Sequence, residues 1–117
     1  MFHSVLLEPA AYASYRRSGR FPDGTMLALI IRHPAERVAP ARSGRFAGEL
    51  VAVELAVKDS ARFAGRWAYF DFGRRAAGAA APPQPRGRCQ ACHAEHAGRD
   101  NVFVQFYPLL GERKGMQ

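Results

Sequence analysis

Hydrophobic and polar positions alternate most clearly between residues 45 and 59. Every second residue from 51 to 57 is a branched apolar one: Val51, Val53, Leu55 and Val57 alternate with Ala52, Glu54, Ala56 and Lys58. A period of two predicts a β-strand with one face turned toward a core. The apolar run 25–32 lacks this alternation, so it predicts a strand buried on both faces or packed beneath a helix.

Two more segments have the composition of strands, and one has the composition of a helix. Residues 3–8 and the aromatic segment 66–73 predict short strands. Residues 8–19 predict a short helix, because Pro9 suits a first helical turn and Gly19 suits a C-terminal stop. Two arginines in its last turn complement the negative end of the helix dipole.

The remaining segments are less regular. Residues 33–44 contain two prolines and predict a loop, and the Gly-, Ala- and Pro-rich stretch 73–88 predicts an irregular connection. The two cysteines follow, and we expect residues 89–99 to form a helix that carries them. Residues 101–110 have a strand-like composition, although a helical turn before Pro108 also fits.

These elements predict one α+β domain over residues 1–117, with a small antiparallel sheet, one early helix and one late helix. A chain of 117 residues buries roughly two thirds of its unfolded surface, so it needs no disulfide to form a core. No apolar run is long enough to span a bilayer, and the first residues lack the pattern of a signal peptide. We therefore expect no membrane partner.

The chain carries a formal net charge of +7, and all its cations except Lys58 and Lys114 are arginines. These arginines are scattered along the sequence and accompany no known nucleic-acid-binding signature. We expect a solvated basic surface and no nucleic-acid partner. A basic rim that attracts an acidic redox partner protein is an alternative reading.

The candidate chemistry lies in the stretch Cys89-Gln90-Ala91-Cys92-His93. In a c-type haem site, the spacing C-x-x-C lets one helical turn present both sulfurs to one edge of the porphyrin. The histidine that follows then binds the iron. Cys89 and Cys92 are the expected covalent attachment points, and His93 is the expected axial ligand.

Three alternatives remain open from the motif alone. Cys89, Cys92 and His96 could form a zinc clip in a basic module without haem, but the four ligands of a structural zinc site are incomplete. A redox dithiol of the thioredoxin type would need a βαβ context, which the predicted elements lack. The third alternative is a chance pair of cysteines.

Several segments besides the cysteine motif point to one family. Downstream of His93, the matching positions are Ala97, Asp100, Val102, Phe103, Phe106, Tyr107, Pro108 and Leu110. Upstream, the segments 19–25, 53–63 and 66–72 match in the same order. Over nearly its whole length the chain resembles the cytochrome P-460 family, which includes the cytochromes c′-beta.

The resemblance implies an antiparallel sheet with helices, one covalently attached haem c packed against the sheet, and a homodimer. It also implies a five-coordinate iron with His93 on the proximal side and an open distal side. The helix that precedes the first strand in family members has no counterpart here, so we expect the natural start to lie upstream. Thioether attachment normally takes place outside the cytoplasm, which implies a periplasmic location.

The two branches of the family differ on the distal side of the haem. Cytochromes P-460 oxidise hydroxylamine, and a lysine bonded to their porphyrin corresponds in position to Leu29. A distal acid of some members corresponds to Leu55, and Phe21 is a candidate distal lid. Two leucines at these positions favour binding of NO or similar small gases, or electron transfer in nitrogen-oxide metabolism. The alternative is an enzyme that oxidises hydroxylamine or NO.

The alternation of the strands suggests the same distal environment. Thr25, Leu27, Leu29 and Ile31 share one strand face, and the branched residues from Val51 to Val57 share another. If both faces cover the iron, the distal pocket is dry and apolar. Glu54 would then face the solvent or pair with an arginine.

Overall fold

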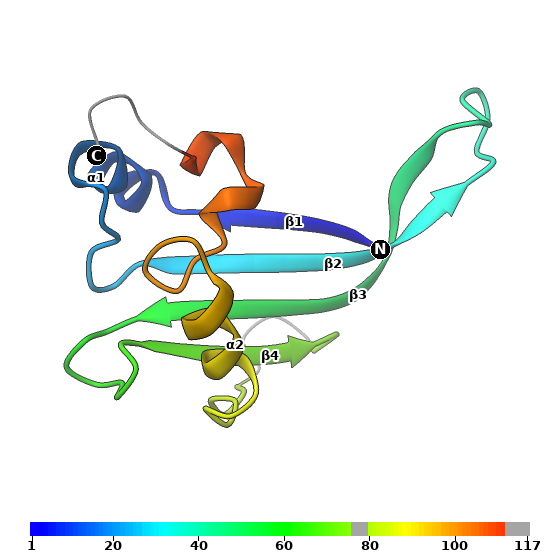
Figure 1. Cartoon of the computed structure of the whole chain (residues 1–117). Helices are drawn as coiled ribbons and strands as arrows, with labels where there is room; N and C mark the ends of the chain where they lie inside the picture. The colour runs from blue at the N-terminus through cyan, green and yellow to red at the C-terminus, as the bar shows by residue number, and fades with distance from the viewer. Residues whose placement is uncertain (76–79, 112–117) are drawn as a thin grey trace.

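The computed structural model describes residues 1–75 and 80–111 and has the predicted α+β architecture (Figure 1). A four-stranded antiparallel sheet has the order β1-β2-β3-β4, so each strand pairs with its neighbour in sequence. The elements are β1 (Phe2–Leu7), α1 (Pro9–Ser18), β2 (Met26–Glu36), β3 (Arg45–Lys58), β4 (Trp67–Gly73), α2 (Cys89–His96) and the 3₁₀ turns η1 (Val104–Phe106) and η2 (Pro108–Leu110). The early helix and the late helix are both confirmed. Neither is long and apolar enough to cross a membrane, in the part of the chain that the structure describes.

Helix α1 begins and ends as its sequence predicts. Pro9 occupies the first turn, and Gly19 adopts a left-handed conformation with φ 75° that ends the helix. The backbone N–H of Gly19 donates to the carbonyl of Tyr15, which satisfies one of the terminal carbonyls. Tyr15 is buried and stacks on Phe21 with ring centroids 4.5 Å apart, which joins the helix to the core.

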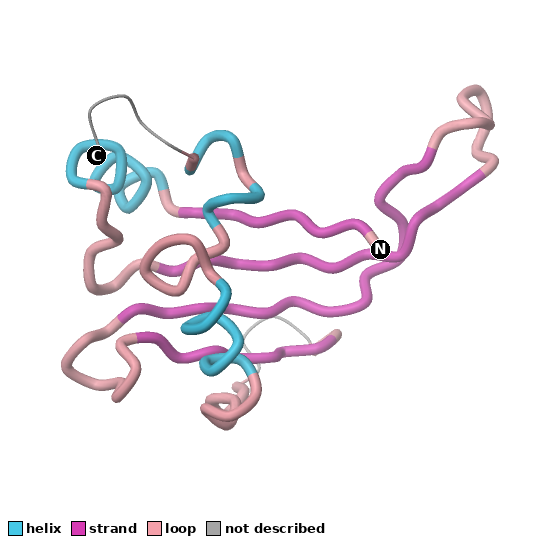
Figure 2. The backbone as a smooth tube through the Cα atoms, in the orientation of Figure 1, coloured by secondary structure: helices cyan, strands magenta, loops and turns pink. Residues whose placement is uncertain are grey.

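Strand β2 is longer than the sequence predicts. The segment 33–44 was expected to be a loop, but β2 continues to Glu36 and pairs there with the start of β3. Pro34 is accommodated because the pairing shifts register between Arg32 and Pro34, and a sheet tolerates proline at such irregularities. The last residues of β2 and the first residues of β3 form an arm that projects away from the rest of the sheet (Figures 1 and 2).

The strand pairing defines the two faces of the sheet. Leu29 lies opposite Val5 on one side and Glu54 on the other, and Glu54 lies opposite Asp71. Residues directly opposite one another in antiparallel strands share a face. We call this the inner face; it includes His3, Val5, Leu7, Leu27, Leu29, Ile31, Ala52, Glu54, Ala56, Lys58, Trp67, Tyr69 and Asp71.

The core lies against the inner face. Helix α2 and the segment after it cross in front of the strands in Figure 1. The buried core cluster joins α1 and the turns η1 and η2 to the sheet and consists of Tyr15, Phe21, Leu27, Trp67, Tyr69, Val102, Val104 and Leu110. The opposite, outer face of the sheet carries the alternate residues, such as Ala28, Leu55 and Phe70.

The segment 101–110 is not a strand. It forms the turns η1 and η2, so the expectation of a helical turn before Pro108 is correct and the strand-like reading is wrong. Burial decides this conformation, because Val104 and Leu110 both enter the core. The hydroxyl of Tyr15 also donates to the carbonyl of Leu110 at 2.6 Å, which holds the segment against α1.

The connection from β4 to α2 falls partly outside the described residues, which exclude 76–79. Its second half is more ordered than predicted, since Pro83 bridges to Phe70 and the N–H of Gln84 donates to the carbonyl of Tyr69 at 2.7 Å. This contact extends the edge of the sheet toward α2. Helix α2 ends at His96, before the predicted end at residue 99.

Candidate functional site

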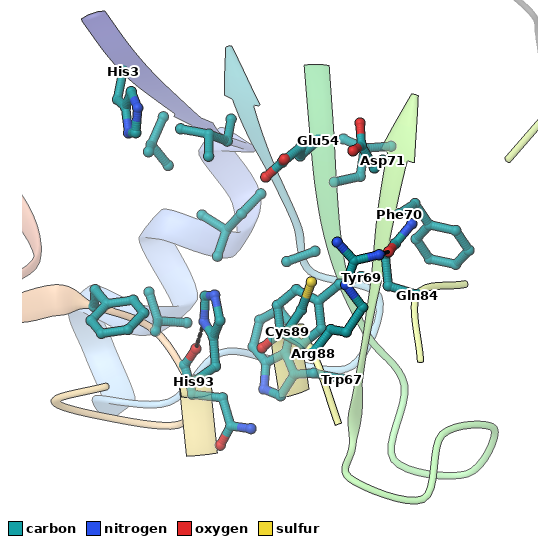
Figure 3. A pocket seen from close by; sticks show the side chains of 18 of the residues that line it. His3, Glu54, Trp67, Tyr69, Phe70, Asp71, Gln84, Arg88, Cys89 and His93 are labelled. Carbon is teal, nitrogen blue, oxygen red and sulfur yellow. Dashed lines mark hydrogen bonds between the residues drawn. The ribbon is translucent and has the colours of Figure 1, made fainter. Parts of the chain in front are cut away.

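A cavity of about 400 Å³ lies on the inner face of the sheet (Figure 3). It is bounded by the strands, by α2 and by the segment that follows α2. A volume of this size falls within the roughly 300–1,000 Å³ of typical small-molecule sites. Most of the lining is apolar or aromatic, and it includes Val5, Leu27, Leu29, Ala56, Trp67, Tyr69, Val102, Phe103, Phe106 and Tyr107.

Helix α2 places the cysteine motif beside this cavity. Cys89 and Cys92 are both free thiols, separated by one helical turn. Cys89 is half-buried and lines the cavity, whereas Cys92 is exposed. Burial raises the pKa of the Cys89 thiol. The first turn of α2 therefore presents the Cys89 sulfur to the cavity and leaves Cys92 exposed.

His93 also lines the cavity, and its Nδ1 lies 2.8 Å from the carbonyl oxygen of Asn101. Figure 3 marks this contact with a dashed line. Because a carbonyl can only accept, Nδ1 carries the proton and Nε2 keeps a free lone pair. Tyr69 and Phe103 flank the imidazole, with ring centroids at 4.5 Å and 4.8 Å. The ring is thus oriented, and Nε2 is available to a metal.

The Asn101 carbonyl belongs to a tight turn between Arg99 and Val102. These two residues form a bridge, and the residues between them, Asp100 and Asn101, have φ values of 46° and 59°. Two successive positive φ values are typical of a type I′ turn, in which Asp and Asn are favoured. Asp100 and Asn101 therefore reverse the chain direction after α2.

Asp100 is also part of a contact that the sequence did not reveal. Its carboxylate pairs with the Lys58 ammonium at 2.6 Å and accepts from the Trp67 indole N–H at 3.2 Å. Lys58 donates in addition to the carbonyl of Phe21 at 2.6 Å. The only hint in the sequence was a lysine in the alternating strand 45–59, at a position that the pairing places on the inner face.

The distal residues expected from the sequence are only partly brought together. Leu29 lies on the inner face and lines the cavity. Leu55 borders the cavity, but it pairs with Ala28 and Phe70, so its side chain belongs to the outer face. Val53 and Val57 share this outer face with Leu55, so the condition that the branched face of β3 covers the site is not met.

Glu54 lies on the face of β3 that the branched series was expected to occupy. It lies on the inner face opposite Asp71 and lines the cavity, so the expectation of a solvent-facing Glu54 is wrong. Burial raises the pKa of Glu54, and the neighbouring charge of Asp71 raises it further. The cavity consequently has an acidic end, which Figure 3 shows with Glu54 and Asp71 side by side, and it is not uniformly apolar.

Phe21 does not line the cavity. Its side chain is 1% exposed and lies between Tyr15 and Trp67 in the core. A ring held on both sides in this way is a packing residue, so the distal-lid expectation for Phe21 is corrected. Tyr69 does face the cavity. Its hydroxyl is buried without a partner at hydrogen-bonding geometry among the described residues, and burial raises the pKa of this group.

The rival readings of the cysteine motif receive no support from the geometry. No group of three or more His, Cys, Asp or Glu residues within 1–75 and 80–111 is arranged to hold a metal ion, which leaves the zinc clip without a ligand set. His96 is exposed and lies 3.5 Å from Glu95. All strand pairs are antiparallel, so the βαβ context of a thioredoxin-like dithiol is absent from the described sheet.

The donor set fits a c-type haem. Two free thiols lie one helical turn apart, and the next residue presents an imidazole whose Nδ1 is already bonded to a carbonyl. Beside them lies a cavity walled by aromatic and aliphatic side chains, as a porphyrin requires. A hydrogen-bond acceptor on the other ring nitrogen is the usual companion of a metal-bound imidazole.

Comparison with known proteins agrees with this chemistry. The family model described as Cytochrome P460 matches residues 1–104 of the chain. The comparison with curated proteins found no match. This family implies haem binding. Since its model covers most of the 117 residues, the chain belongs to the Cytochrome P460 family.

Proposed function

We propose that the chain holds one haem covalently through Cys89 and Cys92, with Nε2 of His93 as the axial ligand of the iron. The observation that carries this proposal is the bond from His93 Nδ1 to the Asn101 carbonyl, beside two free thiols and an aromatic cavity. The haem would supply an iron centre that binds a small ligand and changes oxidation state. The protein supplies the attachment, the imidazole orientation and the shape of the cavity.

Covalent attachment is tested by the mass of the denatured protein, expressed with periplasmic export and a haem-attachment system. We expect the wild type to keep the mass of one haem after denaturation, because thioether bonds survive it. Replacing both Cys89 and Cys92 by serine should abolish this retention. A wild type that releases its haem on denaturation would contradict the covalent attachment.

We further propose a five-coordinate iron with an open sixth position. Leu29 and Ala56, which line the cavity from the sheet, have no atom that can bind iron. His3 also lines the cavity, but Figure 3 shows it at the end opposite His93. An open, largely apolar position admits neutral diatomic molecules, so we favour NO or a similar gas as the ligand, or electron transfer in nitrogen-oxide metabolism. Addition of CO to the reduced protein should shift its absorption spectrum without displacing His93.

The second candidate is an oxidoreductase that acts on hydroxylamine or NO. Glu54 favours it, because a carboxylate with a raised pKa at the cavity can accept a proton from a bound substrate. Leu29 argues against a porphyrin cross-link at that strand position. Hydroxylamine-dependent reduction of a dye acceptor by the wild type, lost in Glu54→Gln, would make this enzyme the leading candidate.

We propose a homodimer and a periplasmic location as well. The radius of gyration of the chain is 16.1 Å, whereas a compact domain of this length has about 13 Å. The arm and the outer face also leave large apolar side chains exposed, among them Leu6, Met26 and Phe46. A second copy of the chain would cover them. The location follows from the thioether chemistry, which is normally carried out outside the cytoplasm.

A further inference from the structure

A buried ion pair holds the turn that contacts the proposed axial ligand. The side chains of Lys58 and Asp100 are 11% and 13% exposed, and their charged atoms are 2.6 Å apart. Lysine and aspartate are almost never this deeply buried without a partner. Neither residue lines the cavity, so neither is explained by contact with a ligand.

The ion pair holds a turn that needs support. Asp100 and Asn101 both have positive φ, a conformation that costs free energy in residues other than glycine. Both carboxylate oxygens of Asp100 are engaged, one by Lys58 and the other by the indole N–H of Trp67. Lys58 is itself fixed by its bond to the Phe21 carbonyl in the core. The turn is therefore tied to β3 and β4 by charge-assisted bonds.

The residue next to this anchor carries the carbonyl that holds the imidazole. Asn101 follows Asp100 directly, and its carbonyl accepts from His93 Nδ1 at 2.8 Å. A displacement of the Asp100 side chain would move this carbonyl, since only a few backbone bonds separate them. The acceptor of a ligating histidine orients the ring and raises its basicity toward the metal.

We propose that Lys58, Asp100 and Trp67 form a tether that positions the Asn101 carbonyl on His93 Nδ1 and so sets how strongly His93 donates to the iron. This inference rests on the proposed function, in which His93 is the axial ligand. Lys58 and Asp100 act through His93 and are positioning residues. Their loss weakens the Nδ1 hydrogen bond, makes the imidazole a poorer donor and stabilises the ferrous state.

The test compares haem-loaded variants by resonance Raman spectroscopy and by redox titration. We expect Lys58→Met and Asp100→Ala to lower the frequency of the iron–histidine stretch in the ferrous protein. We also expect the ferric-to-ferrous equilibrium to shift about tenfold toward ferrous iron, equal to 59 mV for a one-electron couple. Asp100→Asn keeps the shape and the acceptor but loses the charge, so it should shift both readouts less and in the same direction.

Asp23→Ala is the matched control. Asp23 accepts hydrogen bonds from the backbone N–H and the hydroxyl of Ser60, a residue close to Lys58 in sequence. Among the described residues, no hydrogen bond joins Asp23 to the turn of Asp100 and Asn101. It should lower the melting temperature without moving the iron–histidine frequency. If Asp100→Asn and Lys58→Met also leave the frequency and the equilibrium unchanged, the tether serves stability alone and the inference is wrong.

Two further outcomes have defined meanings. If Asp100→Ala and Lys58→Met do not fold, Asp100→Asn decides alone: a lowered frequency supports the tether, and an unchanged one overturns it. A wild type with attached haem but no iron–histidine band would overturn the proposed axial role of His93, and the inference with it. An error in the proposed axial role of His93 is thus seen in the wild type, whereas an error in the proposed tether is seen only in the variants.

Discussion

Glu54 brings a carboxylate to the edge of a largely apolar cavity. Burial raises its pKa above the ordinary value of 4.5, and Asp71 on the neighbouring strand adds to this effect. An acid whose pKa is raised by folding binds its proton more tightly in the folded state. Between the ordinary and the raised pKa, stability therefore falls as pH rises.

Glu54→Gln tests this placement. The free energy of unfolding of the wild type should fall as pH rises from 4.5 through the raised pKa, and Glu54→Gln should lose this part of the slope. Urea denaturation of the haem-loaded protein at several pH values measures it. The control is Glu49→Gln, an exposed glutamate on the same strand that pairs with Arg74. An equal pH dependence in wild type and Glu54→Gln would contradict the buried position.

Single residues also mark the limit of what the sequence predicts at the site. The spacing of Cys89, Cys92 and His93 identified the candidate motif for haem attachment, because this signal is local. The faces of β3 were misassigned, because the alternation predicts a core-facing branched series, whereas the pairing places Glu54 and Lys58 on the inner face. A one-residue error in phase exchanges the two faces of a strand. With the two faces exchanged, the sequence interpretation placed Leu55 in the site and Glu54 outside it. The bond from Lys58 to Asp100 joins residues 42 positions apart, and no local pattern predicts such a contact.

At the level of elements, α2 must dock firmly if the cysteine motif is to face the cavity. Gln90 is the one residue of α2 that is buried. Its side-chain amide donates to the carbonyl of Gly65, just before β4, at 3.2 Å. Gly65 allows this approach, since a Cβ at that position would overlap the Gln90 side chain.

Gly65→Ala should consequently loosen the docking of α2. We expect a loss of about 1 kcal/mol in the free energy of unfolding, the typical worth of one hydrogen bond. Thermal denaturation of the haem-loaded protein measures the change. Gly87→Ala is the control, because an added Cβ there meets no atom within 4 Å. Equal melting temperatures for the two variants would show that the Gln90 contact contributes little.

Elements with strong local signals were predicted well. Proline at the start and glycine at the end defined α1, and composition defined the four strands. The extension of β2 to Glu36 was missed, because two prolines indicate a loop unless the partner strand is known. The segment 101–110 was also hard to predict, since its conformation depends on burial of Val104 and Leu110 against distant residues.

At the level of the whole molecule, the sheet has one covered face and one face that carries exposed apolar residues. Leu6 and Met26 are 55% and 44% exposed. Both alternate with inner-face residues, so they lie on the outer face. An apolar sheet face of this kind is typical of an interface between copies of a chain.

The proposed dimer is tested by light scattering during size-exclusion chromatography. We expect the mass of two chains for the wild type and of one chain for Leu6→Glu with Met26→Glu, because two carboxylates would be buried in the interface. Leu109→Glu is the control, since Leu109 is 74% exposed and lies in η2, away from the outer face. A wild type with the mass of one chain would contradict the dimer.

The most direct test of the central claim is the absorption spectrum of the dithionite-reduced protein. The protein would be expressed with periplasmic export and a haem-attachment system. A covalent, unmodified haem bound by His93 alone predicts an ordinary high-spin ferrous spectrum of the c type. A Soret band shifted strongly to the red would contradict the account, because it indicates a cross-linked porphyrin despite Leu29, and absence of any haem band would refute haem attachment at Cys89 and Cys92.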